Sequence, residues 1–153
     1  MGILFFYIEL LVWAMLIAFQ VDVTHAIKVK SMIQGAADAA TLAGSLQNHQ
    51  EVNQYDEAGA PIGFGFKLND DFSPENAAEA AWQKNISNFK EGAGFNTVPQ
   101  FQRTLDDKGI TCTVNQTVQM TVSQTVMNRF FGEGAAPQVQ VRVPVTAVSK
   151  VYP

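Results

Sequence analysis

The stretch ILFFYIELLVWAMLIAF, from Ile3 to Phe19, is an almost unbroken apolar run that contains a single carboxylate, that of Glu9. A helical pattern continues beyond it into an alanine-rich region, and no proline occurs before Pro61. A carboxylate within a segment suited to lipid is energetically costly, so it usually marks a function or a partner. The sequence therefore predicts one long N-terminal helix whose apolar surface is covered by something other than this chain.

Three explanations fit the apolar run. A cleaved secretory signal normally begins with basic residues, whereas Met1-Gly2 carries none and the segment continues into helix without a break. A single-span membrane anchor fits the length, because roughly 17 to 21 apolar residues nearly cross a hydrocarbon core about 30 Å thick. The nearest cations, Lys28 and Lys30, would then place the C-terminal domain in the cytoplasm, unless a basic leader once preceded the run.

The third explanation is a helix that waits in the membrane and later packs against copies of itself. The run is rich in aromatic residues, which an interlocked helix bundle can use. Small residues farther along allow helix backbones to approach closely, and Gly35 is expected to mark a kink or a close contact. The pattern extends to about Gln47, a rod on the order of 65 Å long. The residues expected in subunit packing are Glu9, Phe5, Phe6, Tyr7, Trp13, Phe19, Asp22, Ala36, Ala40 and Gly44.

The segment from Gln20 to Ser45, QVDVTHAIKVKSMIQGAADAATLAGS, resembles the N-terminal signature of tight-adherence (Tad) pilus proteins. In that family a membrane-type helix and an aspartate precede the pattern Q-x-A-A-D-A-A-x-L-A-G. Asp22 stands where the upstream aspartate would be, and the resemblance covers about the first third of the chain. The pattern positions are matched by Gln34, Ala36, Ala37, Asp38, Ala39, Ala40, Leu42, Ala43 and Gly44.

This resemblance implies a pilin or pseudopilin that is inserted in the inner (cytoplasmic) membrane, handled by pilus assembly machinery and prepilin peptidase, and then built into an extracellular filament of the kind used in adhesion. Type IV-like pilins carry a glutamate near the mature N-terminus, thought to neutralise the terminal ammonium of an adjacent subunit. Glu9 is similar to that residue. The sequence departs from the pattern in one respect: a glutamate at the fifth mature position requires processing before Phe5, and Leu4 is not the expected preceding residue.

The predicted fold class is α+β: residues 1–48 form the N-terminal helix, and residues 49–153 form a surface domain with one helix packed on an antiparallel β-sheet. His49 to Asp71 is rich in turn residues and is interpreted as a loop with at most one short strand. The triplet Asn69-Asp70-Asp71 fits a solvated loop better than a calcium site, because its spacing matches no known cation loop.

A second helix is expected to begin at Ser73-Pro74-Glu75, with the Ser73 side chain as its cap and Pro74 at its first position. It should run to about Lys90, with Gly92 as a stop. Its apolar face is formed by Ala78, Trp82, Ile86 and Phe89.

Clean alternation of apolar and polar residues predicts strands in the C-terminal third. The first is expected over 110–126, with Cys112 on its buried face, and the second over 139–147, with Pro144 placing it at a sheet edge or next to a bulge. Between them, Met127 to Gly134 is interpreted as a short helical turn that places Phe130 and Phe131 in the core.

The net charge of −4 and the pI near 5.0 give no electrostatic reason to expect nucleic acid as a partner, because binding phosphates requires clustered Lys and Arg. One cysteine precludes an intramolecular disulfide and a cysteine-based metal site, and no catalytic motif occurs. We therefore expect no enzyme activity, cofactor or metal. Two classes of function remain. The first is the structural subunit of a homo-oligomeric helical filament. The second is a minor pseudopilin or membrane-anchored component that assists such an assembly, or an anchored periplasmic binding domain unrelated to filaments.

Overall fold

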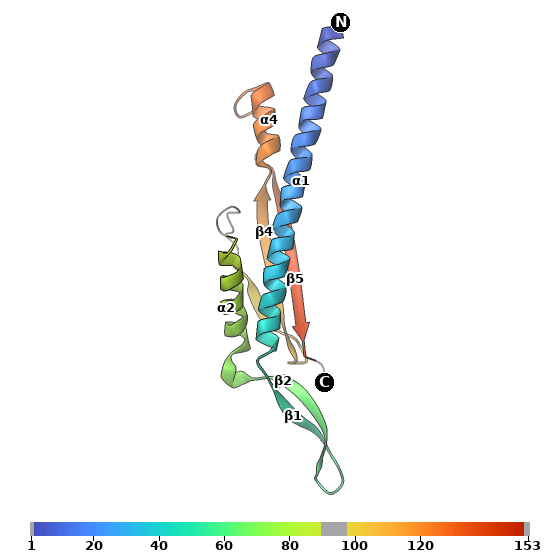
Figure 1. Ribbon diagram of the computed structural model, residues 1–153, viewed down its shortest axis with the longest axis vertical. Helices are drawn as coiled ribbons and strands as arrows, with labels where there is room; N and C mark the ends of the chain where they lie inside the picture. Colours follow the sequence, from blue (N-terminus) through green and yellow to red (C-terminus); the bar gives the residue numbers. More distant parts are fainter. Residues whose placement is uncertain (1, 90–97, 152–153) are drawn as a thin grey trace. The chain divides into compact units, whose positions relative to one another are not determined.

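The computed structural model describes residues 2–89 and 98–151. Its fold is α+β, with the expected long apolar N-terminal helix followed by a small domain of helices and antiparallel strands (Figure 1). The predicted helix stop at Gly92 lies outside the described residues. The elements in chain order are α1 (Gly2–Ser45), β1 (Asn48–Tyr55), β2 (Pro61–Leu68), the 3-10 turn η1 (Asp70–Phe72), α2 (Pro74–Ser87), β3 (Gln100–Arg103), β4 (Gly109–Gln119), α4 (Thr121–Phe131) and β5 (Gln140–Lys150).

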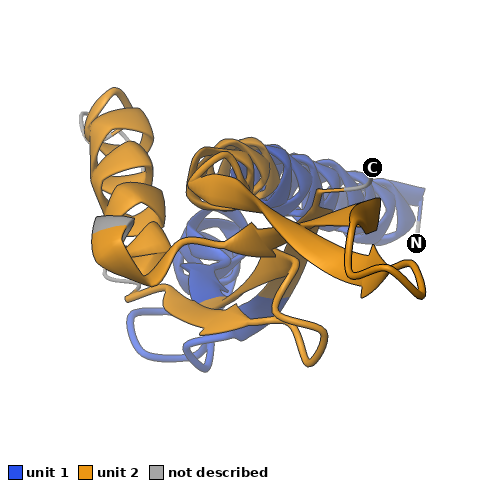
Figure 2. Cartoon of the chain, turned by 90° about the horizontal axis from the view of Figure 1, so that it is seen from below, with its two compact units in different colours: residues 1–31, 116–143 blue, residues 32–115, 144–153 orange. Residues whose placement is uncertain are grey.

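The chain divides into two compact units, which Figure 2 shows in different colours. Unit 1 consists of residues 1–31 and 116–143, so it contains the first part of α1 together with α4. Unit 2 consists of residues 32–115 and 144–153, so it contains the last part of α1, the β1–β2 hairpin, α2 and most of the three-stranded sheet.

Unit 2 is organised around a sheet of strand order β3-β4-β5, in which β3 pairs antiparallel with β4. Its core gathers Leu68, Ala78 and Ile110, with Phe101 packed against them. Helix α2 begins at Pro74 as predicted and ends a few residues earlier than predicted. It buries one face because its apolar residues recur every four positions. The buried residues of α2 are Pro74, Ala78, Trp82 and Ile86.

Ser73 is the N-cap residue of α2 as predicted, but its side chain does not cap the helix. Ser73 occupies the N-cap position, but its φ of 43° is left-handed and its side chain makes no capping hydrogen bond. A capping serine usually has extended backbone angles, which aim its hydroxyl at the first turn. Here the backbone carbonyl of Ser73 instead accepts hydrogen bonds from the N–H groups of Asn76 and Ala77.

The segment predicted as a loop after α1 is a β-hairpin. β1 and β2 pair antiparallel from Asn48 opposite Leu68 to Tyr55 opposite Pro61, with an irregularity after Val52. The turn is closed by Asp56, whose carboxylate accepts hydrogen bonds from two backbone N–H groups within it. Most residues of β1 are exposed and polar, so β1 lacks the alternation by which half-buried strands are recognised. In β2 every second residue is apolar, but the intervening Pro61, Gly63 and Gly65 are residues typical of turns.

The predicted alternation in β4 is confirmed as far as Gln119, with Ile110, Cys112 and Val114 all buried. The strand prediction fails beyond that point, because Val122 and Val126 lie in α4. The predicted core position of Phe130 and Phe131 is also wrong, since these side chains are 47% and 60% exposed.

The predicted second strand is confirmed as β5, which extends from Gln140 to Lys150. Val143, Val145 and Ala147 are buried, whereas Val139 precedes the strand and Val141 is exposed. β5 is an edge strand in the sheet order, as predicted from Pro144.

Candidate functional site

The first part of α1 exposes nearly all of its large apolar side chains. Among the described residues, α1 is the helix that is long and apolar enough to cross a membrane, and only 6% of its most apolar 18-residue stretch is buried. Length and composition alone support that assignment, since a signal sequence passes the same test. An apolar patch of this extent on a soluble surface normally marks contact with a membrane or another protein. The exposed aromatic residues are Phe5, Phe6, Tyr7, Trp13 and Phe19.

Glu9 is exposed in the middle of this apolar surface. Among residues 2–89 and 98–151, no hydrogen bond or ion pair involves its carboxylate. Any lipid or protein that covers the surface must also solvate or pair this charge, because an unpaired buried carboxylate is strongly unfavourable.

Asp22, the next acidic residue along α1, is almost fully buried, with 3% of its surface exposed. Its two carboxylate oxygens accept hydrogen bonds from the backbone N–H groups of Val122, at 3.1 Å, and Ser123, at 2.7 Å. These N–H groups belong to the first turn of α4, where the helix itself supplies no acceptor. The carboxylate also interacts favourably with the positive end of the helix dipole. Asp22 therefore caps α4 from another helix.

α4 needs such a cap because its own N-cap residue is Met120, whose side chain makes no capping hydrogen bond. The helix buries none of its residues completely, so its position depends strongly on a few polar contacts. At its other end, the side-chain oxygen of Asn128 accepts a hydrogen bond of 3.0 Å from the N–H of Ala136. Unit 1 thus holds α4 by a carboxylate at one end and an amide at the other.

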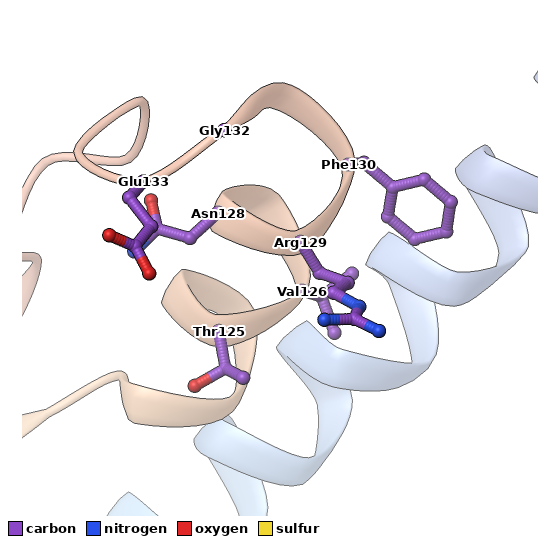
Figure 3. A pocket seen from close by; sticks show the side chains of 7 residues that line it. All are labelled: Thr125, Val126, Asn128, Arg129, Phe130, Gly132 and Glu133. Carbon is purple, nitrogen blue, oxygen red and sulfur yellow. The ribbon is translucent and has the colours of Figure 1, made fainter.

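An open hollow borders the last turns of α4 and the loop that follows it (Figure 3). Arg129 and Phe130 point toward the side where α1 lies, whereas Glu133 points away from it. Arg129 is exposed, and no ion pair involves it in the described part of the chain. The hollow is lined by Thr125, Val126, Asn128, Arg129, Phe130, Gly132 and Glu133.

The small residues expected in subunit packing are buried inside unit 2. Ala36 and Ala40 are 2% and 0% exposed. A Cβ added to Gly44 would lie 2.9 Å from the carbonyl oxygen of Pro74 and 3.1 Å from a side-chain atom of Ile110. The close approach is thus to the chain's own α2 and β4. Gly35 is exposed, and a Cβ there would meet nothing within 4 Å.

Polar contacts add to this packing between the last part of α1 and β5. The hydroxyls of Ser45 and Ser149 share a hydrogen bond of 2.8 Å, and the amide of Gln34 donates to the carbonyl of Thr146 at 3.4 Å. Residues 32–45 of α1 are therefore fastened within unit 2, in contrast to the exposed apolar run at the start of the helix.

The most extensive ionic cluster of unit 2 is centred on Arg103. Its guanidinium donates to Glu75 at 2.6 Å, to Asp70, and to Asp107 at 3.3 Å. The hydrogen bonds from Arg103 lower the pKa of Glu75 and of Asp70. Because these contacts join η1, α2 and β3, we assign the cluster a structural role.

The remaining polar candidates of the sequence also have structural partners or lie exposed. The side chain of Asn69 accepts a hydrogen bond from the N–H of Asp71, so the triplet Asn69-Asp70-Asp71 contains its own hydrogen bond. In the part of the chain that the structure describes, no three metal-binding side chains gather. Cys112 is buried as predicted, and burial raises the pKa of its thiol to about 11. His25 and His49 are both exposed.

The predicted helical turn from Met127 to Gly134 matches the last part of α4, but sequence reasoning missed the start of this helix and its contact with Asp22. A signal for the helix was present, because Val122, Val126 and Phe130 recur every four residues. The same segment also alternates apolar and polar residues near its start, which favoured a strand. No pattern in the sequence pairs Asp22 with a backbone about a hundred residues later.

No protein-family model, curated protein or solved structure matches this chain. Its function is therefore inferred from its own residues and their geometry.

Proposed function

We propose that this chain is a structural, pilin-like subunit that polymerises into an extracellular filament through its N-terminal helix. One observation carries the proposal. Helix α1 is continuous from Gly2 to Ser45, its last part is packed within the chain, and its first part presents bare aromatic side chains. A subunit that is anchored by one end of a helix and associates by the other has this division of surfaces.

The exposed run is a strong source of association energy. Each Å² of apolar surface removed from water contributes about 25 cal/mol, so covering about 300 Å² contributes roughly 7.5 kcal/mol relative to exposure to water, whether lipid or protein covers it. A lipid bilayer can cover the run before assembly, and identical helices can cover it afterwards. Aromatic side chains favour the protein environment, because edge-to-face ring contacts add to simple burial. Phe6 and Tyr7 already form one such contact within the helix.

The resemblance of Gln20–Ser45 to the Tad signature agrees with this proposal. It adds the route: insertion in the cytoplasmic membrane, handling by prepilin peptidase and pilus assembly machinery, and export to the cell surface. The acidic net charge favours no nucleic acid partner.

A second function, that of a minor pseudopilin or membrane-anchored assembly component, is favoured by the length of 153 residues. Major pilins of the Tad system are usually far shorter. The two functions differ in how much of this chain a filament contains.

Abundance distinguishes them. Cells that express the chain are sheared, the filaments are pelleted, and the protein bands are compared. We expect this chain to be the dominant band. Its presence as a trace component would favour the pseudopilin. Its complete retention in the membrane would overturn the structural-subunit function and leave only the membrane-anchored component.

The proposed surface is tested with aromatic variants. Phe6→Ala and Trp13→Ala should lower the yield of filaments while leaving membrane insertion intact, because both side chains are exposed on the run. Phe64→Ala is the matched control, since Phe64 is an exposed aromatic residue on β2. Equal filament yields from all three variants would contradict the assignment of the run as the subunit interface.

A further inference from the structure

The proposed filament leaves one electrostatic question open, which is what neutralises Glu9 when its surroundings become protein. A carboxylate enclosed among aromatic side chains requires a cation and hydrogen-bond donors, or it destabilises the assembly by several kcal/mol. No described residue of the same chain supplies a cation or a hydrogen-bond donor to Glu9. We therefore look for the cation on another copy of the chain.

Arg129 is a cation for which the described residues provide no anionic partner. It lies in the last turn of α4 beside Phe130, and no ion pair satisfies it within the described residues. Glu133, four residues later, points to the opposite side of the hollow (Figure 3). The carboxylate of Asp22 already accepts hydrogen bonds from the first turn of α4. A guanidinium is also the cation best suited to partly apolar surroundings, because it is weakly hydrated and can hold a carboxylate with two parallel hydrogen bonds.

The other cations of unit 1 are less well placed. Lys28 and Lys30 lie beyond Asp22 on α1, in the direction away from Glu9. Arg142 is on β5 and therefore not on α4, the helix that Asp22 holds beside α1. Arg129 is carried by α4, which lies beside α1 and points toward the N-terminal end of that helix (Figure 1).

The contact between Asp22 and Ser123 fixes the two helices in register within unit 1. From this common level, Glu9 is 13 residues away along α1, or roughly 20 Å, because 22 − 9 = 13. Arg129 is 6 residues away along α4 in the same direction, or roughly 9 Å, because 129 − 123 = 6. The two groups of one copy are thus offset by about 10 Å along the helix axis.

We infer that, in the assembly, Glu9 of one copy forms an ion pair with Arg129 of a neighbouring copy that is displaced by about 10 Å along the helix axis. This inference rests on the proposed filament function. In this arrangement the apolar run of one copy packs against the exposed part of α4 of the neighbouring copy. Phe130 and Phe131 are then covered together with the ion pair. Because of the displacement, each copy pairs its Glu9 with one neighbour and its Arg129 with another. This is the head-to-tail arrangement that generates an open helical filament.

Charge exchange tests the pair in the full-length chain, with pelleted filament as the readout and membrane-fraction content as the check on insertion. Glu9→Arg and Arg129→Glu should each lower filament yield about tenfold or more, because each juxtaposes like charges. The double variant should recover most of that loss. Arg142→Glu is the matched control, and it should neither block assembly nor rescue Glu9→Arg. A double variant no better than the single variants, or normal assembly by Arg129→Glu, would overturn the inference.

Cross-linking supplies a measurement that does not depend on the charge variants being inserted. Two differently tagged chains, Glu9→Cys and Arg129→Cys, each with Cys112→Ala, are co-expressed and treated with a short bis-maleimide linker. We expect a mixed dimer carrying both tags. Arg142→Cys replaces Arg129→Cys in the control and should yield none.

The outcomes separate this inference from the proposed function. Filaments that form normally but give no Glu9–Arg129 cross-link would overturn the ion pair and leave the filament function standing, with a lipid headgroup or an amino terminus as the partner of Glu9. Failure of the unmodified chain to form any filament would overturn both. A measured axial step between neighbouring copies near 10 Å would support the pair.

Discussion

The carboxylate of Asp22 accepts a hydrogen bond of 2.7 Å from the backbone N–H of Ser123, although the two residues stand 101 positions apart. This contact converts the end of a strand into the start of a helix. β4 stops at Gln119, and the next residues begin α4 with their first-turn N–H groups directed at the carboxylate. The same contact sets α4 against α1 and so positions Arg129.

Removal of this cap should loosen α4 without unfolding unit 2. We expect Asp22→Ala to destabilise α4 by about 1–3 kcal/mol, because two helix N–H groups lose a buried, charged acceptor. Amide hydrogen exchange at Val122 and Ser123 measures the effect. Asp38→Ala is the control, since Asp38 is an exposed carboxylate on the same helix. Unchanged exchange in Asp22→Ala would show that the cap does not hold α4.

The same substitution at two glycines of α1 should have opposite effects. Gly44→Ala should destabilise the chain by about 1–3 kcal/mol, because the new Cβ meets the fixed backbone oxygen of Pro74 at 2.9 Å. Gly35→Ala should stabilise it by about 0.5–1 kcal/mol, since alanine is the better helix former and the site is open. Thermal unfolding of the full chain in detergent, followed by the buried Trp82, measures both. A stabilised Gly44→Ala variant would contradict the close packing of α1 on α2.

Acid should weaken the Arg103 cluster. Arg103 lowers the pKa of Glu75 and Asp70 below their ordinary values of 4.5 and 3.8. A lowered pKa means that the unfolded chain binds protons first, so this contribution is present above about pH 4.5 and is lost as the pH falls further. In Arg103→Gln, stability should depend less on pH in that range, whereas the control Lys84→Gln should keep the unmodified profile. Identical acid unfolding curves for Arg103→Gln and the unmodified chain would refute this role.

The thiol of Cys112 should be inert in the folded chain. Burial raises its pKa to about 11, so almost no thiolate forms near pH 8, and the side chain is 0% exposed. Maleimide labelling should be slow and should accelerate in urea. A Thr117→Cys variant that also carries Cys112→Ala places the thiol on the exposed face of the same strand and should react about a hundredfold faster or more. Rapid labelling of Cys112 at pH 8 without denaturant would show that unit 2 opens readily.

Where a segment's structure is governed by its own residues, the sequence predicted it well. α1 and α2 carry long helical periodicities, and α2 has proline at its first position. β4 and β5 alternate over most of their length because one face of each is largely buried. The β1–β2 hairpin was not recognised because β1 is polar and largely exposed, and because the proline and glycines that alternate with the apolar residues of β2 are typical of turns.

Whether each acidic residue of α1 is exposed or buried could not be predicted in the same way. Glu9 and Asp22 belong to one helix and differ little as residues, yet one is exposed and the other is buried against α4. Likewise, Ala36 and Gly44 looked suitable for contact between subunits and are instead packed within unit 2.

The sequence by itself determined that this protein has a long, bare, aromatic helix joined to a small α+β domain, because apolar composition and helical periodicity are local properties. The tertiary structure decided which small and acidic residues of that helix are used internally and which remain available. The reason is physical: a side chain's partner is set by the backbone that folds next to it, and for Asp22 that backbone lies 100 and 101 residues farther along the chain.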